Sequence, residues 1–225
     1  MGVFALLLAV ASAFLMEEKA AILSQSVVQH QVKRGKLFLS KDFWLIAFSY
    51  LAIAFATSIV MTFLVAYFSL DLSIEYAISA SLASVIAFSG IAGSLIFPKL
   101  SDRIGRKKSL LLCNLAVAAS VFGLVNAGAN IIVLYCLAVV YGAFYPATFP
   151  IYAACASEYF GAKSSGSVLG LWTLFYGIGA TASPTIAGYM SESMGSYSPA
   201  FTLSAAIMIL SVILLLPITS RPRSK

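Results

Sequence analysis

The sequence predicts an all-α integral membrane protein, folded as a six-helix transmembrane bundle. Of its 225 residues, 61% are hydrophobic and only 10% are charged, whereas soluble domains carry about 25% charged residues. Each charge-free run is long enough for at least one helical span of about 20 residues. The lengths favour helices over barrel strands, which would need alternating polarity. The uncharged runs are Phe43–Leu70, Tyr76–Pro98, Ser109–Ser157, Ser164–Ser191 and Ser193–Ser220.

The chain starts with an apolar stretch, Val3–Met16, that is too short to cross a bilayer comfortably. It lacks the basic start of a signal peptide. We expect residues 1–16 to be the remnant of a preceding transmembrane helix and residues 17–42 to be a cytoplasmic linker. Residues 43–220 should form the six-helix part, and 221–225 a cytoplasmic tail. The expected spans are Trp44–Leu70, Ala77–Phe97, Ser109–Gly128, Ile131–Ala156, Val168–Met190 and Pro199–Pro217.

The distribution of basic residues predicts the orientation of these spans. The linker, the Lys99–Lys108 loop, the Glu158–Lys163 loop and the tail hold five, five, one and three Lys or Arg, which accounts for all 14. The intervening loops hold none. Because basic loops stay in the cytoplasm, we expect a multi-pass protein, in the cell membrane, with a cytoplasmic C-terminus. The net charge of +6 therefore indicates topology, and no nucleic-acid partner is expected.

Other residue types give no indication of an enzyme. Cys113, Cys136 and Cys155 lie in apolar runs, without metal-ligand or disulfide spacing. The single histidine, His30, lies in the polar linker. The spacings of metalloproteases, serine hydrolases and phosphate-binding loops are missing. We therefore expect no catalytic residue, no metal and no cofactor.

The segment Pro98–Lys108 carries the most specific pattern, Pro-Lys-Leu-Ser-Asp-Arg-Ile-Gly-Arg-Lys-Lys. It resembles the signature loop of the major facilitator superfamily, G-x-L-x-D-R-x-G-R-[KR], with Pro98 in place of the first glycine. Less specific stretches resemble the oxalate/formate antiporter and monocarboxylate carrier branch: Lys41–Leu45, Ala143–Pro150, Glu158–Lys163, Gly177–Pro184 and Gly195–Phe201. The matches in the signature loop are Leu100, Asp102, Arg103, Gly105, Arg106 and Lys107.

The resemblance implies the second half of a transporter fold, with two inverted three-helix repeats and a solute site facing a first half. It implies that Asp102 stabilises a helix end of that other half and so acts in a conformational switch. Arg103 and Arg106 would pair with Asp102 and with Glu158, although Glu158 is also explained as a plain interfacial charge. The implied partners are the lipid bilayer, a small-molecule solute and a missing N-terminal six-helix half.

The spans contain no ionisable acid, base or histidine in their interior, where a carboxylate carrier of this branch is expected to hold basic residues. Either anion binding and proton coupling lie in the other half, or the solute is not a carboxylate. Candidate cavity residues are polar and uncharged, although helix packing explains them too. They are Tyr145 and Tyr176 first, then Asn114, Tyr141 and Trp172, with Tyr50 and Thr57 as weaker candidates.

Prolines and glycines in the fourth and fifth spans are candidate hinges, and close packing is an equally good explanation. These residues are Pro146, Pro150, Gly177, Gly179 and Pro184. The sequence therefore predicts a secondary transporter of a small organic solute, with a carboxylate as one candidate, working by alternating access. The alternatives are a half-transporter or small membrane protein that needs a partner, and a non-transporting membrane scaffold.

Overall fold

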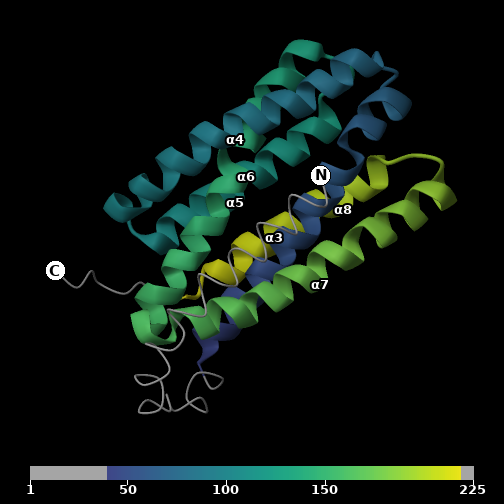
Figure 1. Cartoon of the computed structure of the whole chain (residues 1–225). Coiled ribbons are helices and arrows are strands. Elements are labelled where there is room, and N and C mark those ends of the chain that lie inside the picture. Colours follow the sequence, from purple (N-terminus) through teal and green to yellow (C-terminus); the bar gives the residue numbers. More distant parts are fainter. Residues whose placement is uncertain (1–39, 219–225) are drawn as a thin grey trace, which may run out of the picture. The chain divides into compact units, whose positions relative to one another are not determined.

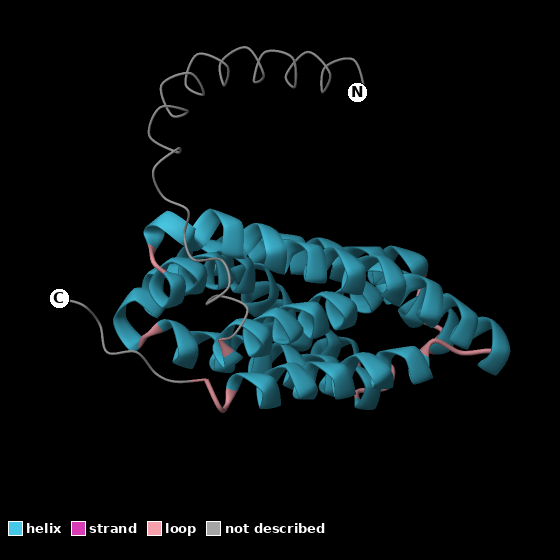
Figure 2. Ribbon diagram, turned by 90° about the horizontal axis from the view of Figure 1, so that it is seen from below, coloured by secondary structure: helices cyan, strands magenta, loops and turns pink. Residues whose placement is uncertain are grey.

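The computed structural model describes residues 40–218, which are helical almost throughout and contain no strand (Figures 1 and 2). Short loops join the successive helices. The expected remnant at residues 1–16, nearly all of the linker at 17–42 and the tail at 221–225 lie outside the described residues. The elements are α3 (Lys41–Ala66), the π-helical turn η1 (Tyr67–Asp71), α4 (Tyr76–Ile104), α5 (Arg106–Asn126), α6 (Ile131–Phe160), α7 (Ala162–Met194) and α8 (Ser198–Leu215).

Within residues 40–218 a helix covers all or nearly all of each of the six expected spans, and most of these helices extend beyond them. α4 continues through Pro98 to Ile104, and α5 begins at Arg106, so the segment expected to be a basic loop is helical except at Gly105. The Glu158–Lys163 loop is likewise reduced to Gly161 between α6 and α7. Hydropathy indicates where a chain leaves the lipid, whereas backbone hydrogen bonding continues into the polar region.

Five helices within residues 40–218 are long and apolar enough to cross a membrane, namely α3 with η1, α4, α5, α6 and α8. α7 is the longest helix, with 33 residues, but it is rich in serine, threonine and glycine. At 1.5 Å per residue it is about 50 Å long, which is sufficient to span the bilayer. α7, which covers the fifth expected span, is therefore long enough to cross, but it is not apolar enough to count among those five helices.

The helix contacts show an internal pseudo-symmetry that relates the first three helices to the last three. The α4–α6 contact corresponds to the α7–α3 contact, and the α5–α6 contact corresponds to the α8–α3 contact. The α5–α8 contact corresponds to itself. Exchanging α3, α4 and α5 with α6, α7 and α8 leaves this set of contacts unchanged. Corresponding helices, such as α3 and α6, run in opposite directions because consecutive helices are antiparallel (Figure 1). The predicted pair of inverted three-helix repeats is thus confirmed.

The α4–α6 contact depends on glycines at which the backbones meet. A Cβ atom built on Gly93 would lie 1.8 Å from the carbonyl oxygen of Ala143, and one on Gly142 would lie 2.4 Å from that of Ile86. No side chain fits at such distances. Glycine therefore sets how closely these two helices cross, as is common in membrane bundles.

The equivalent α3–α7 contact also has a glycine at its crossing point. A Cβ atom on Gly179 would lie 2.5 Å from the carbonyl oxygen of Leu51. Gly177, two residues away, has no atom within 4 Å of such a Cβ atom. Of the two neighbouring glycines, only Gly179 is required by the packing.

Basic residues gather at one end of the bundle, whereas acidic residues occur at both ends. One end carries the start of α3, the α4–α5 and α6–α7 turns and the end of α8 (Figure 1). The other end carries Asp71, Glu75 and Glu192. The six antiparallel helices therefore bring together the basic residues that the sequence places in alternate loops: Lys41, Lys99, Arg103, Arg106, Lys107, Lys108 and Lys163.

Candidate functional site

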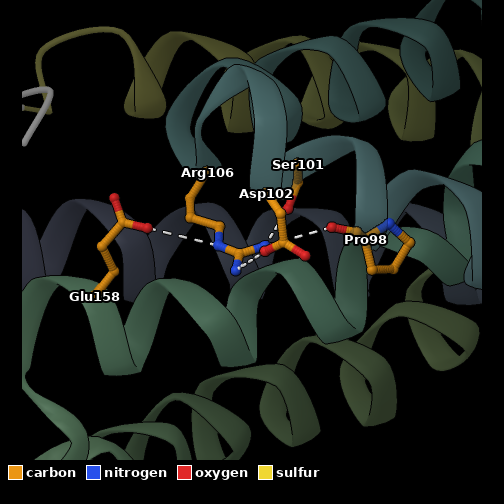
Figure 3. A network of polar contacts seen from close by, with 5 residues as sticks. All are labelled: Pro98, Ser101, Asp102, Arg106 and Glu158. Carbon is orange, nitrogen blue, oxygen red and sulfur yellow. Dashed lines mark hydrogen bonds and ion pairs between the residues drawn. The ribbon is translucent and has the colours of Figure 1, made fainter. Parts of the chain in front are cut away.

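The basic end holds an ion-pair network centred on Arg106, the first residue of α5 (Figure 3). Its guanidinium pairs with Asp102, four residues earlier on α4, and its Nε lies 3.6 Å from Oε2 of Glu158 on α6. It also donates to the hydroxyl of Ser101 and, at 3.5 Å, to the carbonyl oxygen of Pro98. One half-buried cation thus joins three helices.

Gly105 allows this geometry because the chain reverses at that single residue. Its φ of 98° lies in the region that favours glycine. Lys107 follows, and its Nζ donates to the carbonyl oxygens of Leu216 at 2.8 Å and Ile218 at 2.5 Å. A cation at the C-terminal end of a helix satisfies unpaired carbonyls and complements the helix dipole.

The remaining residues of the signature segment point elsewhere. Leu100 is half-buried, whereas Arg103 and Lys108 are exposed. Arg103 forms no ion pair with any of the residues that the structure describes. The carboxylate of Asp102 is 59% exposed in addition to its contact with Arg106. Arg106 therefore makes the Asp102 and Glu158 contacts expected for the pair Arg103 and Arg106.

At the opposite end, Asp71 closes the start of α8. Its Oδ2 accepts hydrogen bonds from the backbone N–H groups of Tyr197 at 2.7 Å and Ser198 at 2.9 Å, and from the hydroxyl of Ser196 at 2.7 Å. α8 receives no capping bond from its own N-cap side chain. A carboxylate from the end of η1 takes that role and also complements the helix dipole.

A fully buried polar network connects four helices in the interior. The Asn114 amide on α5 donates to the Tyr152 hydroxyl on α6 at 3.2 Å and to the Ser211 hydroxyl on α8 at 2.9 Å. The hydroxyl of Ser49 on α3 lies 2.8 Å from both of these hydroxyls. Asn114 is thus part of a helix–helix hydrogen-bond network, the packing explanation that the sequence left open.

Five tyrosines from α3, α6 and α7 adjoin this network. Tyr50 packs between Tyr152 and Tyr176, with ring centroids 4.4 and 4.9 Å away. Tyr141 stacks on Tyr145 at 5.6 Å. Tyr145 and Tyr176 are half-buried, and their hydroxyl groups lie near each other. These two first-choice cavity candidates therefore lie together, at the accessible edge of the cluster.

Two other cavity candidates are enclosed. Tyr141 is completely buried, and its hydroxyl donates to the carbonyl oxygen of Thr57 at 3.5 Å. Trp172 is also completely buried, and its indole N–H donates to the carbonyl oxygen of Phe43 at 3.2 Å. Phe160 packs edge-on against this indole. The polar group of each ring is thus already hydrogen-bonded inside the bundle.

The candidate hinge residues all lie inside continuous helices. α6 runs unbroken through Pro146 and Pro150, and α7 through Gly177, Gly179 and Pro184. The Pro146 ring packs beside Gly90 at the α4–α6 crossing. Packing therefore occupies Pro146 and Gly179, while Gly177 is exposed.

Sequence reasoning missed the residue that caps the start of α8 and most of the residues that hold its middle. The sequence pattern did not indicate a role for Asp71, Ser49, Tyr152 or Ser211. Serine and tyrosine are common in membrane helices, so only spatial proximity identifies their network. A carboxylate just after a long apolar run was the one available indication for Asp71.

Comparison with known proteins places this arrangement in a family. The sequence profile of the Major Facilitator Superfamily matches residues 1–125 and 46–225. Monocarboxylate transporter 12 from Xenopus laevis is 29% identical over 187 residues, covering 81% of this chain and 40% of that protein. The protein of the same name from Mus musculus is 31% identical over 189 residues, covering 82% and 38%. The expected similarity to monocarboxylate carriers is confirmed.

The fold is also found among solved structures. The crystal structure of the POT family transporter PepTSo superimposes with a TM-score of 0.63 at 14% sequence identity, covering 81% of this chain and 39% of that one. The chain thus spans about two fifths of the length of the proteins it matches. These proteins are transporters, in agreement with the prediction that the chain is not an enzyme. This multi-pass membrane chain belongs to the major facilitator superfamily, and α3–α8 form one six-helix half of that fold.

Proposed function

We propose that this chain forms the second half of a secondary transporter, which moves a small organic solute across the cell membrane by alternating access. The basic end of the bundle lies in the cytoplasm. A first six-helix half completes the solute pathway. The observation that carries the proposal is the Arg106 network, because it ties the α4–α5 turn to the end of α6 on one face of a bundle that belongs to a transporter family.

The outer face of α7 supports the need for another half. Thr173, Gly177, Thr181 and Thr185 are exposed at four-residue spacing, so they lie on one face of the helix. Together with the apolar residues Leu174, Ile178, Ala182 and Ile186 they line a shallow groove of about 780 Å³. Hydroxyl-bearing and small residues favour contact with protein or water over contact with lipid. We therefore assign this face to the first half and to the solute pathway.

The Asp102 carboxylate supports the alternating-access step. It extends from the end of α4 and remains 59% exposed at the basic end. A carboxylate in this position is available to a helix N-terminus of the first half, where it is worth about 0.3–2 kcal/mol. Such a contact changes the ratio of two conformations severalfold. Arg106 fixes the carboxylate in place for that contact.

A small carboxylate is the solute class that we propose, because the similar proteins are named monocarboxylate transporters. The interiors of α3–α8 supply no Lys, Arg or His to bind an anion. Hydroxyl groups of the tyrosine cluster are then the donors that this half offers. The cationic partner of the carboxylate, and any proton coupling, belong to the first half.

Two measurements test the proposal. The chain is purified from its native membrane and examined by mass spectrometry for a stoichiometric N-terminal half. The purified material is then reconstituted into liposomes, and uptake of radiolabelled pyruvate is measured with and without an inward proton gradient. We expect copurification and saturable uptake. If the chain purifies without an N-terminal half and takes up no small carboxylate, a non-transporting scaffold is the better explanation.

A further inference from the structure

The Tyr50 hydroxyl is a buried hydrogen-bonding group without a partner among the described residues. Tyr50 is 1% exposed, and no atom of residues 40–218 lies in hydrogen-bonding geometry with its hydroxyl. Leaving such a group unsatisfied is costly, and native proteins rarely do so without a functional reason. We infer that the Tyr50 hydroxyl donates a hydrogen bond to the transported solute, an inference that rests on the proposed function.

The neighbouring tyrosines make this inference specific to Tyr50. Tyr152 packs against it, but the Tyr152 hydroxyl is already bonded to Ser49 and to Asn114. On its other side is Tyr176, which lies near Tyr145 at the half-buried edge of the cluster. The unsatisfied hydroxyl therefore belongs to a ring that packs directly behind the half-buried Tyr176.

The chemistry of the group indicates which part of a solute it recognises. A phenol donates one hydrogen bond and is neutral at physiological pH. Apart from Lys41 at its first residue, α3 has no basic side chain that would compete with Tyr50 for an anionic solute. Because the Tyr50 hydroxyl donates no hydrogen bond when solute is absent, it gains a new hydrogen bond when a carboxylate or carbonyl oxygen of the solute binds. Tyr50 is thus assigned as a specificity-determining residue for an oxygen acceptor.

Tyr50→Phe removes this donor and keeps the ring, and Tyr152→Phe is the matched control. Both variants are prepared in the full chain with its copurifying half and reconstituted for pyruvate uptake. For Tyr50→Phe we expect a KM about tenfold higher, from loss of one hydrogen bond to an anion, with an almost unchanged maximal rate. Thermal unfolding in detergent should show Tyr50→Phe as stable as the wild type and Tyr152→Phe less stable, because only the latter breaks internal bonds.

The outcomes separate this inference from the proposed function. An unchanged KM in Tyr50→Phe overturns the role of Tyr50 while leaving transport in place. A loss of thermal stability equal to that of Tyr152→Phe also overturns it, because the hydroxyl would then have an internal partner. A wild-type protein that takes up no pyruvate overturns the proposed solute class, and the Tyr50 role with it.

Discussion

The Nε atom of Arg106 lies 3.6 Å from Oε2 of Glu158, so a cation at the start of α5 meets the acid that precedes the end of α6. The two residues come from different three-helix repeats. Their pairing couples the repeats at the basic end of the bundle. The same guanidinium holds Asp102, which leaves that carboxylate positioned at the surface.

Replacing Asp102 with Asn should lower the transport rate severalfold and leave membrane insertion intact. The substitution removes a charge from a largely exposed position, where the effect on folding is within about 1 kcal/mol. Its effect on the balance between conformations is then measured as initial uptake rate in vesicles, normalised to inserted protein. Equal rates for variant and wild type would show that Asp102 is not part of a switch.

Glu158→Gln tests the coupling between the repeats. If the Arg106–Glu158 pair matters for the cycle, the double variant Asp102→Asn with Glu158→Gln should lose less activity than the sum of the single losses, measured as free energies. Such a cycle isolates the interaction of residues that share a partner. If the two losses in activation free energy simply add, Glu158 is a plain interfacial charge.

Asp71→Ala should lower the stability of the bundle by about 1 kcal/mol, because the carboxylate caps the start of α8. Thermal unfolding in detergent measures this effect. Glu75→Ala is the matched control, since Glu75 lies in the same loop and is exposed. A larger loss for Glu75 than for Asp71 would contradict the assignment of the cap.

Gly179→Ala should destabilise the α3–α7 crossing, whereas Gly177→Ala should be tolerated. The added methyl would collide with the Leu51 carbonyl oxygen in the first case and meets no atom within 4 Å in the second. Overpacking of this kind costs about 1–3 kcal/mol. Folded yield after detergent extraction distinguishes them. Equal behaviour would mean that the helices separate readily at Gly179.

Cysteine labelling tests the orientation. Single cysteines at Arg103 and at Glu192, in a background without Cys113, Cys136 and Cys155, should react with a membrane-impermeant reagent from opposite sides. Basic residues gather at one end of the bundle, and that end should be cytoplasmic. Reaction of both positions from the same side would rule out the arrangement of spans described above.

The sequence was sufficient to predict the spans and the family, because long charge-free runs and the Pro98–Lys108 motif depend on local composition and order. It failed at the helix ends. The expected loop around Gly105 is mostly helix, since polar residues continue the hydrogen-bond ladder outside the lipid. Membrane hydropathy measures depth and not backbone conformation.

The interior of the site was harder to predict for a different reason. Asn114, Tyr141 and Trp172 stand out as polar or aromatic residues in apolar runs, yet their burial and partners depend on helices far away in sequence. Tyr50 was only a weak candidate, because nothing in its local sequence shows that its hydroxyl lacks a partner. A missing hydrogen bond is a property of the packed bundle alone.

Hydrogen bonds from residues of the first repeat restrict the movement of α8. Asp71 holds its first N–H groups, Lys107 holds the last carbonyls, and Ser49 and Asn114 hold Ser211 between them. Sliding by one helical turn would break contacts at all three levels at once. During a conformational cycle, α3, α5 and α8 should consequently travel as one rigid block.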